Sequence, residues 1–420
     1  MYKQYFKQAL ASLRENPLVS FLTILGTALS VAMMMVLVWV YQVKTSSFAP
    51  VSERHRMLYV NIIEGINEQG SGYRGGALGV RMVKECFYSL TTPETVTAVG
   101  TNVRQKRISV AGNKFVREGD VREVDHHFWD VFDFRFLNGS PLTEAIFASA
   151  IPAAVITEDV ARQFFGTTEV VGQTLQLDFV EYTIQGVVHP VSEAVGEAYG
   201  EIWIPYSVNK ALMNGDAVEG IGGQLRVCIL ARSSADFAKV RQEVNSRIET
   251  FNSGQKEFFA NIWGQPLTST QLMFTFIQGE RMSGTFSGML SLAALFLLLP
   301  VFNLLGIIIS QIRKRRPEIG LRKAFGATAQ TVTGQILAEN LVVTLIGSAI
   351  GFCLSLAFFY IAKGSLLERP DVDLQLNMII QPALLLVVVV LSLLINLLST
   401  GIPAWQASRA QATDSLNATN

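Results

Sequence analysis

Charged residues are scarce in this sequence. Asp, Glu, Lys and Arg make up 16% of the 420 residues, whereas about a quarter of a soluble globular chain is charged. Acidic and basic residues number 34 each, so the formal net charge is zero. Positive charge gathers at Arg313, Lys314, Arg315 and Arg316, directly after a long apolar run. This cluster raises two alternatives, a nucleic-acid patch and the cytoplasmic end of a membrane helix.

Motifs for nucleotide binding and for hydrolytic chemistry are missing. The sequence contains no GxxxxGK[ST] phosphate-binding loop, no HExxH or GxSxG motif and no CxxC pair. Glycine-rich residues 70–79 lack the GK[ST] ending and are predicted to form a flexible loop. His126 and His127 would face opposite ways on a strand, and no nearby Cys or His completes a metal set. We therefore expect no catalytic residue, no metal site and no bound cofactor in this chain.

Cysteine is rare, with three residues in the chain. Cys353 lies in an apolar run, where it is expected to be a small packing residue. Cys86 and Cys228 lie in the long segment between the first two apolar runs. Outside a cell, oxidising conditions permit a disulfide between Cys86 and Cys228, and two free thiols are the alternative.

Long apolar runs are abundant. Four stretches are nearly free of charge and exceed the roughly 20 residues needed to cross a bilayer. They are residues 18–43, 283–311, 331–362 and 377–404. The first is longer than the apolar part of a cleaved signal peptide, and no small-residue cleavage site follows it, so we expect an uncleaved anchor. The predicted fold class is an α-helical membrane protein with four transmembrane helices and a large mixed α/β extracytoplasmic domain of two lobes.

Basic residues set the predicted orientation, because short cytoplasmic loops carry an excess of Lys and Arg. The 313–316 cluster is explained in this way, without nucleic acid. Residues 1–17 carry basic side chains and the apolar spacing of an amphipathic helix on the inner membrane surface. The predicted cytoplasmic segments are 1–17, 312–330 and 405–420, and the predicted external segments are 44–282 and the short loop 363–376.

The external segment is long enough for an independent domain and has mixed α and β patterns. Strands are predicted at 57–63, 153–157, 174–179, 182–188, 201–205 and 224–231, and helices at 79–92, 158–166 and 234–253. The apolar runs at both ends must lie side by side in the membrane, so the first and last parts of the segment are predicted to pair. The middle, about 116–205, would form a distal lobe.

A short amphipathic helix is predicted in the 312–330 loop. Pro317 suits its first turn, Glu318 can pair with Arg322, and Gly326 suits its end. Its residues are Glu318, Ile319, Gly320, Leu321, Arg322, Lys323, Ala324, Phe325, Gly326 and Ala327. Such a helix along the inner membrane surface would dock a soluble partner, and a plain re-entry loop is the alternative.

The third apolar run holds two further features. Gly347 and Gly351 form a GxxxG pattern, which lets helices pack closely either within the chain or across a homodimer seam. Glu339, beside Asn340, is an acid at the membrane edge, where it has either a functional role or simply water beside it.

The second half of the chain resembles the MacB/FtsX-type permeases of ABC transporters. That family carries a charged R…EIG(L/I)R-x-A-x-GA segment between its second and third spans, and this sequence has RPEIGLRKAFGA at 316–327. PAWQASR at 403–409 follows the family's PA-x-x-A-x-R pattern, although Ala412 stands where the family often has proline. Residues 151–188 resemble the MacB-like periplasmic core domain.

The resemblance implies a non-catalytic permease subunit in the bacterial inner membrane, with the large domain in the periplasm and an FtsX-like permease domain at about 283–413. ATP and Mg²⁺ would bind a separate cytoplasmic ABC ATPase that docks on residues 318–327. The motion of that ATPase would be transmitted through the first two spans to the periplasmic domain, a mechanism called mechanotransmission. The permease would dimerise with itself or a paralogue, and further partners would be a periplasmic adaptor and an outer-membrane channel, with no role for nucleic acid.

The resemblance leaves two functions open. One is efflux or release of peptides, drugs or lipoproteins from the periplasmic side. The alternative is an FtsX-like transmembrane regulator that activates an extracytoplasmic cell-wall hydrolase and exports nothing. Regulators of that type have much smaller external domains, so the length of residues 44–282 favours export.

Overall fold

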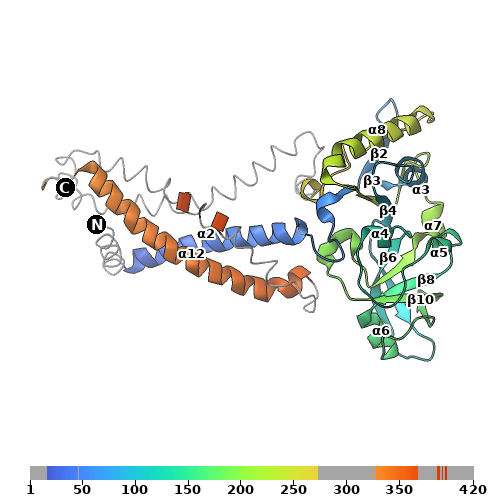
Figure 1. Cartoon of the computed structure of the whole chain (residues 1–420), viewed down its shortest axis with the longest axis horizontal. Coiled ribbons are helices and arrows are strands. Elements are labelled where there is room, and N and C mark those ends of the chain that lie inside the picture. Colours follow the sequence, from blue (N-terminus) through green and yellow to red (C-terminus); the bar gives the residue numbers. More distant parts are fainter. Residues whose placement is uncertain are drawn as a thin grey trace. The chain divides into compact units, whose positions relative to one another are not determined.

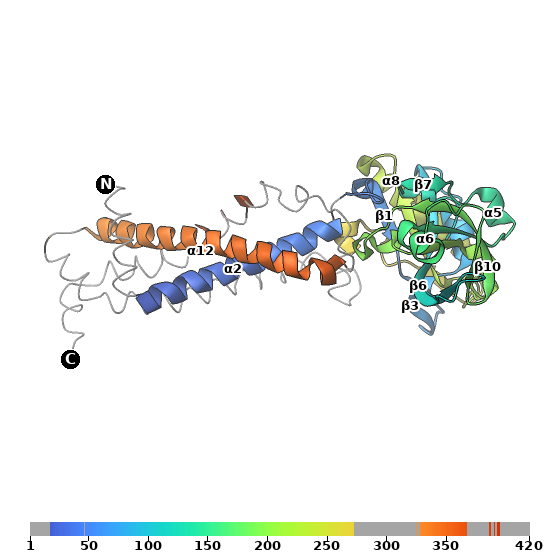
Figure 2. The same ribbon diagram turned by 90° about the horizontal axis from the view of Figure 1, so that it is seen from below.

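The structure is a computed structural model of the chain. It describes residues 17–45, 47–272, 325 and 328–367, with positions 386, 387, 390, 393 and 394. The chain divides into two compact units. One unit contains most of α2 (Pro17–Thr45) and of α12 (Ala329–Leu367), and the other contains every described strand (Figures 1 and 2).

The first unit is built on apolar helices that pack against each other. Large side chains make part of this contact: Val31, Met34, Met35 and Trp39 of α2, with Phe352, Leu356 and Phe359 of α12. Among the described residues, one helical segment, Asn340–Ile361, is long and apolar enough to cross a membrane, and α2 contains the shorter apolar segment Ser20–Val36. The predicted span at 283–311, most of the one at 377–404 and nearly all of the predicted helix at 1–17 lie outside the described residues.

Six strands of the second unit close into a ring, here called the barrel lobe. Pairing runs from β11 through β8, β10, β9, β5 and β6 and returns to β11. The strands are β5 (Arg104–Ser109), β6 (Arg117–Val124), β8 (Ala153–Thr157), β9 (Thr174–Leu177), β10 (Val180–Val188) and β11 (Ile202–Pro205). Alternate side chains of each strand face the interior, where α6 (Glu158–Phe165) contributes Val160, Ala161 and Phe164. α6 ends at Gly166, whose φ of 75° suits a glycine.

Short elements follow β6 and complete the barrel lobe. α4 (Phe128–Val131) comes directly after β6, and β7 (Phe136–Gly139) pairs with β10. Further along the chain are α5 (Glu144–Ala148), η3 (Glu193–Ala198) and η4 (Tyr206–Val208).

The remaining strands form the α8 lobe, in which β13 lies between β1 and β4. The strands are β1 (Met57–Val60), β2 (Ile63–Ile66), β3 (Gly72–Leu78), β4 (Thr95–Gly100), β12 (Gly222–Gly223), β13 (Leu225–Leu230) and β14 (Phe259–Asn261). The helices are α3 (Val80–Met82), η2 (Val83–Phe87), α7 (Lys210–Met213), η5 (Ser234–Asp236) and α8 (Phe237–Ser253). The apolar stripe predicted on α8 is its buried face, with Val240, Val244 and Ile248 in the core.

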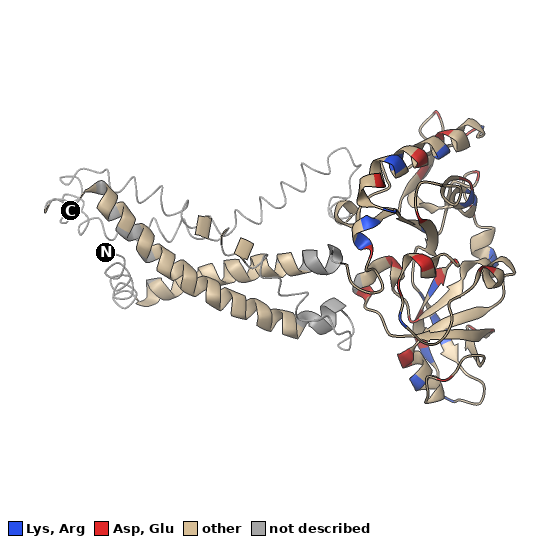
Figure 3. Cartoon of the chain, in the orientation of Figure 1, with Lys and Arg blue, Asp and Glu red and all other residues tan. Residues whose placement is uncertain are grey.

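Each lobe has its own apolar core. The barrel core takes its buried residues from 108–204, and the α8-lobe core takes them from 58–98 and 206–262. The chain therefore builds part of the α8 lobe, leaves it to build the barrel and then returns. Figure 1 shows α8, α3 and β2 toward one end of this unit and α6 and β8 toward the other. Figure 3 marks Lys, Arg, Asp and Glu positions along the helices and strands of both lobes, whereas the described middle parts of α2 and α12 are coloured as other residues.

Most of the periodic strand and helix predictions are confirmed. The strands predicted at 153–157, 182–188, 201–205 and 224–231 are β8, β10, β11 and β13, and the helices predicted at 158–166 and 234–253 correspond to α6 and to η5 with α8. The strand predicted at 57–63 is two strands, β1 and β2.

The loop predicted at 70–79 is wrong, because Gly72–Leu78 forms β3. β3 pairs with β2, β12 and the first residue of β13. Backbone hydrogen bonds to these strands stabilise an extended conformation that the glycines would not favour by themselves. Glycine is also required at position 72, since φ is +141° and a Cβ would lie 2.1 Å from the Gly65 carbonyl oxygen.

Candidate functional site

The chain enters the strand-containing unit through residues 47–56, which follow α2 and are here called the stem. Two apolar stem residues, Phe48 and Val51, are buried at 7% and 1% exposure. The guanidinium of Arg54 is also buried and lies over the Phe48 ring, 5.4 Å from its centroid. A segment this well buried cannot swing freely on the surface of the domain.

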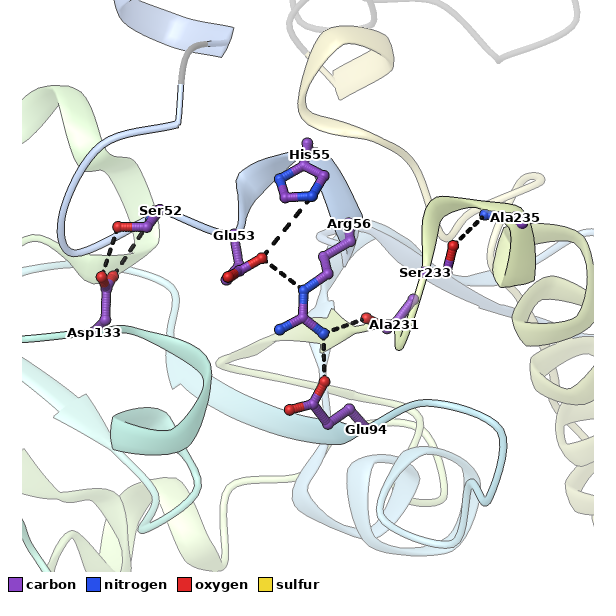
Figure 4. A network of polar contacts seen from close by, with 9 residues as sticks. All are labelled: Ser52, Glu53, His55, Arg56, Glu94, Asp133, Ala231, Ser233 and Ala235. Carbon is purple, nitrogen blue, oxygen red and sulfur yellow. Dashed lines mark hydrogen bonds and ion pairs between the residues drawn. The ribbon is translucent and has the colours of Figure 1, made fainter.

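Arg56, in η1 (Arg54–Arg56) at the end of the stem, fastens it to the α8 lobe. Its Nε donates to Glu53 Oε2 at 2.7 Å, and its Nη1 donates to the Ala231 carbonyl at 2.9 Å and to Glu94 (Figure 4). Hydrogen bonds to Glu53 and Glu94 raise the pKa of the Arg56 guanidinium, so this guanidinium stays charged at any physiological pH. The next residue, Met57, begins β1, and the stem therefore continues directly into the sheet of this lobe.

Asp133, just after α4, fastens the first part of the stem to the barrel lobe. Its Oδ2 accepts a hydrogen bond from the Ser52 hydroxyl at 2.6 Å, and its Oδ1 accepts one from the Ser52 amide at 3.4 Å (Figure 4). The Asp133 amide donates to the Pro50 carbonyl at 2.9 Å. The stem thus touches both lobes, the barrel lobe through Pro50 and Ser52 and the α8 lobe through Arg56.

The last described part of the external segment returns to the same place. The amide of Tyr59 donates to the Leu267 carbonyl at 2.8 Å, and the Leu267 amide donates to the Tyr59 carbonyl at 2.9 Å. The side-chain oxygen of Gln265 accepts from the Asn61 amide at 2.7 Å. The predicted pairing of the first and last parts of the segment is therefore confirmed.

A buried charged group lies beside the stem. The Glu197 carboxylate, on η3, is 3.7 Å from the Arg226 guanidinium on β13. Burial lowers the pKa of Arg54, while interactions with Tyr59 and Glu197 oppose that shift. Stem, barrel-lobe loop and α8-lobe strand therefore each contribute a charge to one shared region.

The two lobes meet where Val124 of β6 pairs with Val99 of β4 and at the next residue, Asp125, which is 1% exposed. Its carboxylate accepts hydrogen bonds from the Thr97 hydroxyl at 2.5 Å, the Ala98 amide at 2.8 Å and the Tyr88 hydroxyl. Burial raises the pKa of Asp125, and these donors offset part of that cost. All three donors belong to the α8 lobe, so Asp125 joins the lobes.

The charged groups described above are bonded to other charged side chains, to hydroxyl groups or to the backbone. His126 and His127 lie with their rings 4.0 Å apart before α4. Within the described ranges, no group of three or more His, Cys, Asp or Glu side chains is placed to hold a metal ion.

The residues predicted to dock an ATPase fall almost wholly outside the described part of the chain. Of residues 318–327, the structure describes Phe325, whose side chain is 85% exposed. The basic cluster at 313–316 also lies outside the described residues. The docking role and the topology role both stay predictions.

Gly347 and Gly351 lie against α2 of the same chain. A Cβ built on Gly347 would be 2.7 Å from the Thr27 Cβ, and one on Gly351 would be 2.4 Å from the Ala28 carbonyl oxygen. Contacts this short leave no space for a side chain. The GxxxG pattern therefore serves a helix pair inside the chain, and a homodimer seam through the same glycines stays a prediction.

The disulfide between Cys86 and Cys228 is not formed, and both thiols are free and buried. Cys86 packs into the α8-lobe core together with Val227 and Ile229 of β13. Cys228 lies between those two residues in the same strand, so its side chain points to the opposite face of the sheet. The sheet itself separates the two sulfurs.

Sequence reasoning missed the residues of the stem and of the lobe joint. Ser52, Asp133 and Asp125 are polar residues with no motif around them. One signal was present, since the short charged run Glu53-Arg54-His55-Arg56 lies about ten residues after the predicted first span, on the predicted external side. A charged run between a predicted membrane helix and an external domain indicates a structural junction. The residues that bond to this run are distant in sequence, so the run alone does not identify them.

Two protein-family models match this chain. The MacB-like periplasmic core domain matches residues 20–247, and the FtsX-like permease C-terminal domain matches residues 290–412.

Curated relatives are longer proteins. The pyoverdine export ATP-binding/permease protein PvdT of Pseudomonas savastanoi pv. phaseolicola is 27% identical over 280 residues, which cover 64% of this chain and 40% of PvdT. The macrolide export ATP-binding/permease protein MacB of Chromobacterium violaceum is 24% identical over 433 residues, which cover 98% of this chain and 60% of MacB. The chain thus spans about half the length of the curated relatives it matches.

Among solved structures, the periplasmic region of MacB from Actinobacillus actinomycetemcomitans is similar with a TM-score of 0.36 and 15% identity, covering 53% of this chain and 93% of that one. The match to the MacB-like core domain extends over more than half of the 420 residues, and the FtsX-like match adds most of the remainder. The chain therefore belongs to the MacB/FtsX family of ABC transporter permeases.

Proposed function

We propose that this chain is the permease subunit of an ABC exporter and that it converts ATP hydrolysis by a separate cytoplasmic ATPase into motion of its periplasmic domain. The observation that carries the proposal is the pair of family matches, which together extend from residue 20 to residue 412. Relatives named for pyoverdine export and macrolide export support the direction of transport. The same relatives are named ATP-binding/permease proteins, which supports ATP hydrolysis as the source of energy.

The proposed topology has four transmembrane helices in the inner membrane. The apolar segment Asn340–Ile361 of α12 supports the third, and α2 with its segment Ser20–Val36 supports the first. The second and fourth rest on the apolar runs at 283–311 and 377–404. The same proposal puts residues 44–282 in the periplasm and residues 312–330 in the cytoplasm, because of the basic cluster in the latter.

Force would enter through the predicted coupling helix at 318–327 and leave through the stem. The coupling helix directly precedes α12, and α12 packs on α2 through Gly347 and Gly351. α2 runs into the stem, which is bonded to both lobes. This covalent and packed route supports mechanotransmission, in which substrate moves outside the membrane and no central pore is needed.

The proposed cargo is a peptide, a drug-like molecule or a lipoprotein taken from the periplasmic side. A dimer of this chain, or of this chain with a paralogue, would work with a periplasmic adaptor and an outer-membrane channel. Purification of the tagged full chain from native membranes tests this assembly. An ATPase with an adaptor and channel supports efflux, whereas a cell-wall hydrolase in their place favours the regulator alternative. Absence of any ATPase contradicts the proposal.

Charge reversal in the coupling helix provides the direct test. We expect Glu318→Lys, Arg322→Glu and Phe325→Asp each to weaken ATPase docking roughly tenfold, which corresponds to about 1–3 kcal/mol from a disrupted charged or apolar contact. Lys363→Glu, in the predicted external loop, is the matched control and should leave docking unchanged. The measurement is ATPase recovery and ATP turnover in the purified complex, and wild-type values in all three variants would refute the coupling role.

A further inference from the structure

The stem is anchored unequally to the two lobes. On the α8-lobe side, Arg56 bonds to Glu94 and to the Ala231 carbonyl, and the chain then continues into β1 within a sheet. On the barrel-lobe side, the start of the stem is held at Pro50 and Ser52 by Asp133, and Arg54 further along the stem interacts with Glu197 of η3. If the first residues of the stem are displaced, the displacement would therefore act on Asp133, because the other end of the stem is fixed at Arg56.

Asp133 ends a short rigid segment, residues 125–133, here called the α4 connector. Phe128, Val131 and Phe132 in it are almost fully buried. The Trp129 ring lies 6.1 Å from the Trp203 ring of β11, which attaches the connector to the barrel lobe. α4 also packs against β4 and β13 of the α8 lobe. The connector thus lies between the lobes.

The other end of the α4 connector is Asp125, a buried residue whose carboxylate is held to the α8 lobe by three hydrogen-bond donors. Buried hydrogen bonds to a carboxylate cost more to break than the same bonds at an exposed site. The Ser52–Asp133 bonds are exposed to water. The two ends of the α4 connector therefore differ. The buried Asp125 is suited to act as a pivot, whereas the exposed Asp133 is the point at which movement of the stem would be transmitted to the connector.

We propose that Ser52 and Asp133 are positioning residues that form a latch between the stem and the α4 connector, and that movement of the stem turns the barrel lobe about the Asp125 joint. The proposal rests on the proposed function, because ATP-driven motion must first reach the stem. It adds that the periplasmic domain does not move as one body. The barrel lobe changes position relative to the α8 lobe.

The test measures the distance between the lobes in the intact complex. Spin labels are attached at Glu169→Cys on the barrel lobe and Asn245→Cys on α8, two exposed positions. Cys353→Ala removes the exposed native thiol, and Cys86 and Cys228 stay buried. The labelled full chain, purified with its ATPase, is compared without nucleotide and with ATP and vanadate.

We expect a nucleotide-dependent shift in the inter-label distance of the wild-type chain and loss of that shift in Ser52→Ala and in Asp133→Ala, with unchanged ATP turnover. The double variant should behave like either single variant, because both remove one interaction. Asp133→Asn keeps one accepting oxygen and should retain part of the shift. Ser140→Ala removes a comparable bond, from Gln185 Nε2 at 2.9 Å, within the barrel lobe and should keep the full shift.

Each remaining outcome contradicts a separate statement. A full shift in Ser52→Ala and Asp133→Ala overturns the latch while leaving the proposed function intact. Absence of any shift in the wild-type chain contradicts the proposed coupling of ATP to domain motion and the latch with it. The nucleotide-free distance controls for folding, since a correctly folded variant must match the wild-type value.

Discussion

Asp125 and Asp133 lie at the two ends of the α4 connector and have opposite surroundings. Asp125 is buried and accepts hydrogen bonds from donors of the α8 lobe, and losing it would leave the Thr97 hydroxyl and the Ala98 amide without this acceptor, at about 1–3 kcal/mol each. Asp133 is exposed and bonds to the stem. Two residues of the same type therefore have different roles, which the environment of each carboxylate decides.

The buried thiols give a prediction at the scale of single residues. Burial raises the pKa of Cys86 to about 12 and that of Cys228 well above its usual value. Only the thiolate reacts, so at pH 8 roughly one Cys86 in ten thousand is reactive even before burial blocks access. We expect maleimide to leave Cys86 and Cys228 unmodified in the native protein and to label both after unfolding, as read by peptide mass.

The same experiment tests the free state of the thiols. The unfolded, unreduced protein should carry two labels from Cys86 and Cys228, and an exposed engineered cysteine, Glu169→Cys, should label before unfolding. A peptide pair joined by a disulfide in the unreduced sample would show that the two sulfurs do meet, contrary to their placement on opposite faces of β13.

At the scale of elements, α2 and α12 can pack closely because two glycines of α12 at their contact have no side chains. Gly347 faces Thr27 and Gly351 faces Ala28 and Val31 across distances that exclude a Cβ. In a membrane, helices associate through such close packing because lipid offers no hydrophobic driving force between them. The pair therefore depends on these glycines more than on the large residues beside them.

Gly347→Leu should separate α2 from α12. The reporter is a short thiol-to-thiol cross-linker between Trp39→Cys on α2 and Phe359→Cys on α12, two positions whose native ring centroids lie 5.2 Å apart. A steric cost of about 1–3 kcal/mol predicts roughly tenfold less cross-linked product when Gly347→Leu is added in a Cys353→Ala chain. The measurement is the yield of joined peptides from one chain.

Gly334→Leu is the matched control, because Gly334 lies on the same helix and no atom of the described residues lies within 4 Å of its built Cβ. Its cross-linking should equal that of the starting chain. Undiminished yield with Gly347→Leu would refute the close packing, and loss of a cross-linked dimer in the same variant would identify a homodimer seam instead.

At the scale of the whole molecule, charge distribution predicts which side of the membrane each segment occupies. A cysteine at Glu169, in the barrel lobe, should react with a membrane-impermeant maleimide in cells whose inner membrane is intact. A cysteine at Thr328, beside the predicted coupling helix, should react only after that membrane is opened. The measurement is labelling of each variant before and after permeabilisation, and the reverse pattern would invert the topology.

The strand and helix patterns of this chain could be predicted because they are local. The alternation in 182–188 and the helical stripe of α8 depend on neighbours within a few residues, and both are found in the structure. The glycine-rich strand β3 escaped prediction because its glycines give no apolar alternation, and pairing with β2 and with the distant β12 holds it extended. The polar strand β5 likewise has little apolar alternation, and it is held by β6 and by the distant β9.

The candidate site was predictable only in outline. The pairing of the two ends of residues 44–282 followed from the membrane helices that flank them, and the Tyr59–Leu267 bonds confirm it. The stem contacts did not follow, because Asp133 is far from Ser52 in sequence and neither belongs to a motif. Hydrogen bonds between exposed polar residues do not produce a periodic pattern in the sequence.

The sequence by itself determined the apolar runs, the proposed orientation, the charged segment at 316–327 and most secondary structure, because run length, net charge and periodicity are properties of neighbouring residues. The tertiary structure decided which distant segments meet. It closed six strands into a barrel, put Cys86 and Cys228 on opposite faces of one sheet, and set the GxxxG glycines against α2. It also joined the stem to both lobes through Arg56 and Asp133. Those contacts depend on chain topology and side-chain packing, which no local pattern specifies.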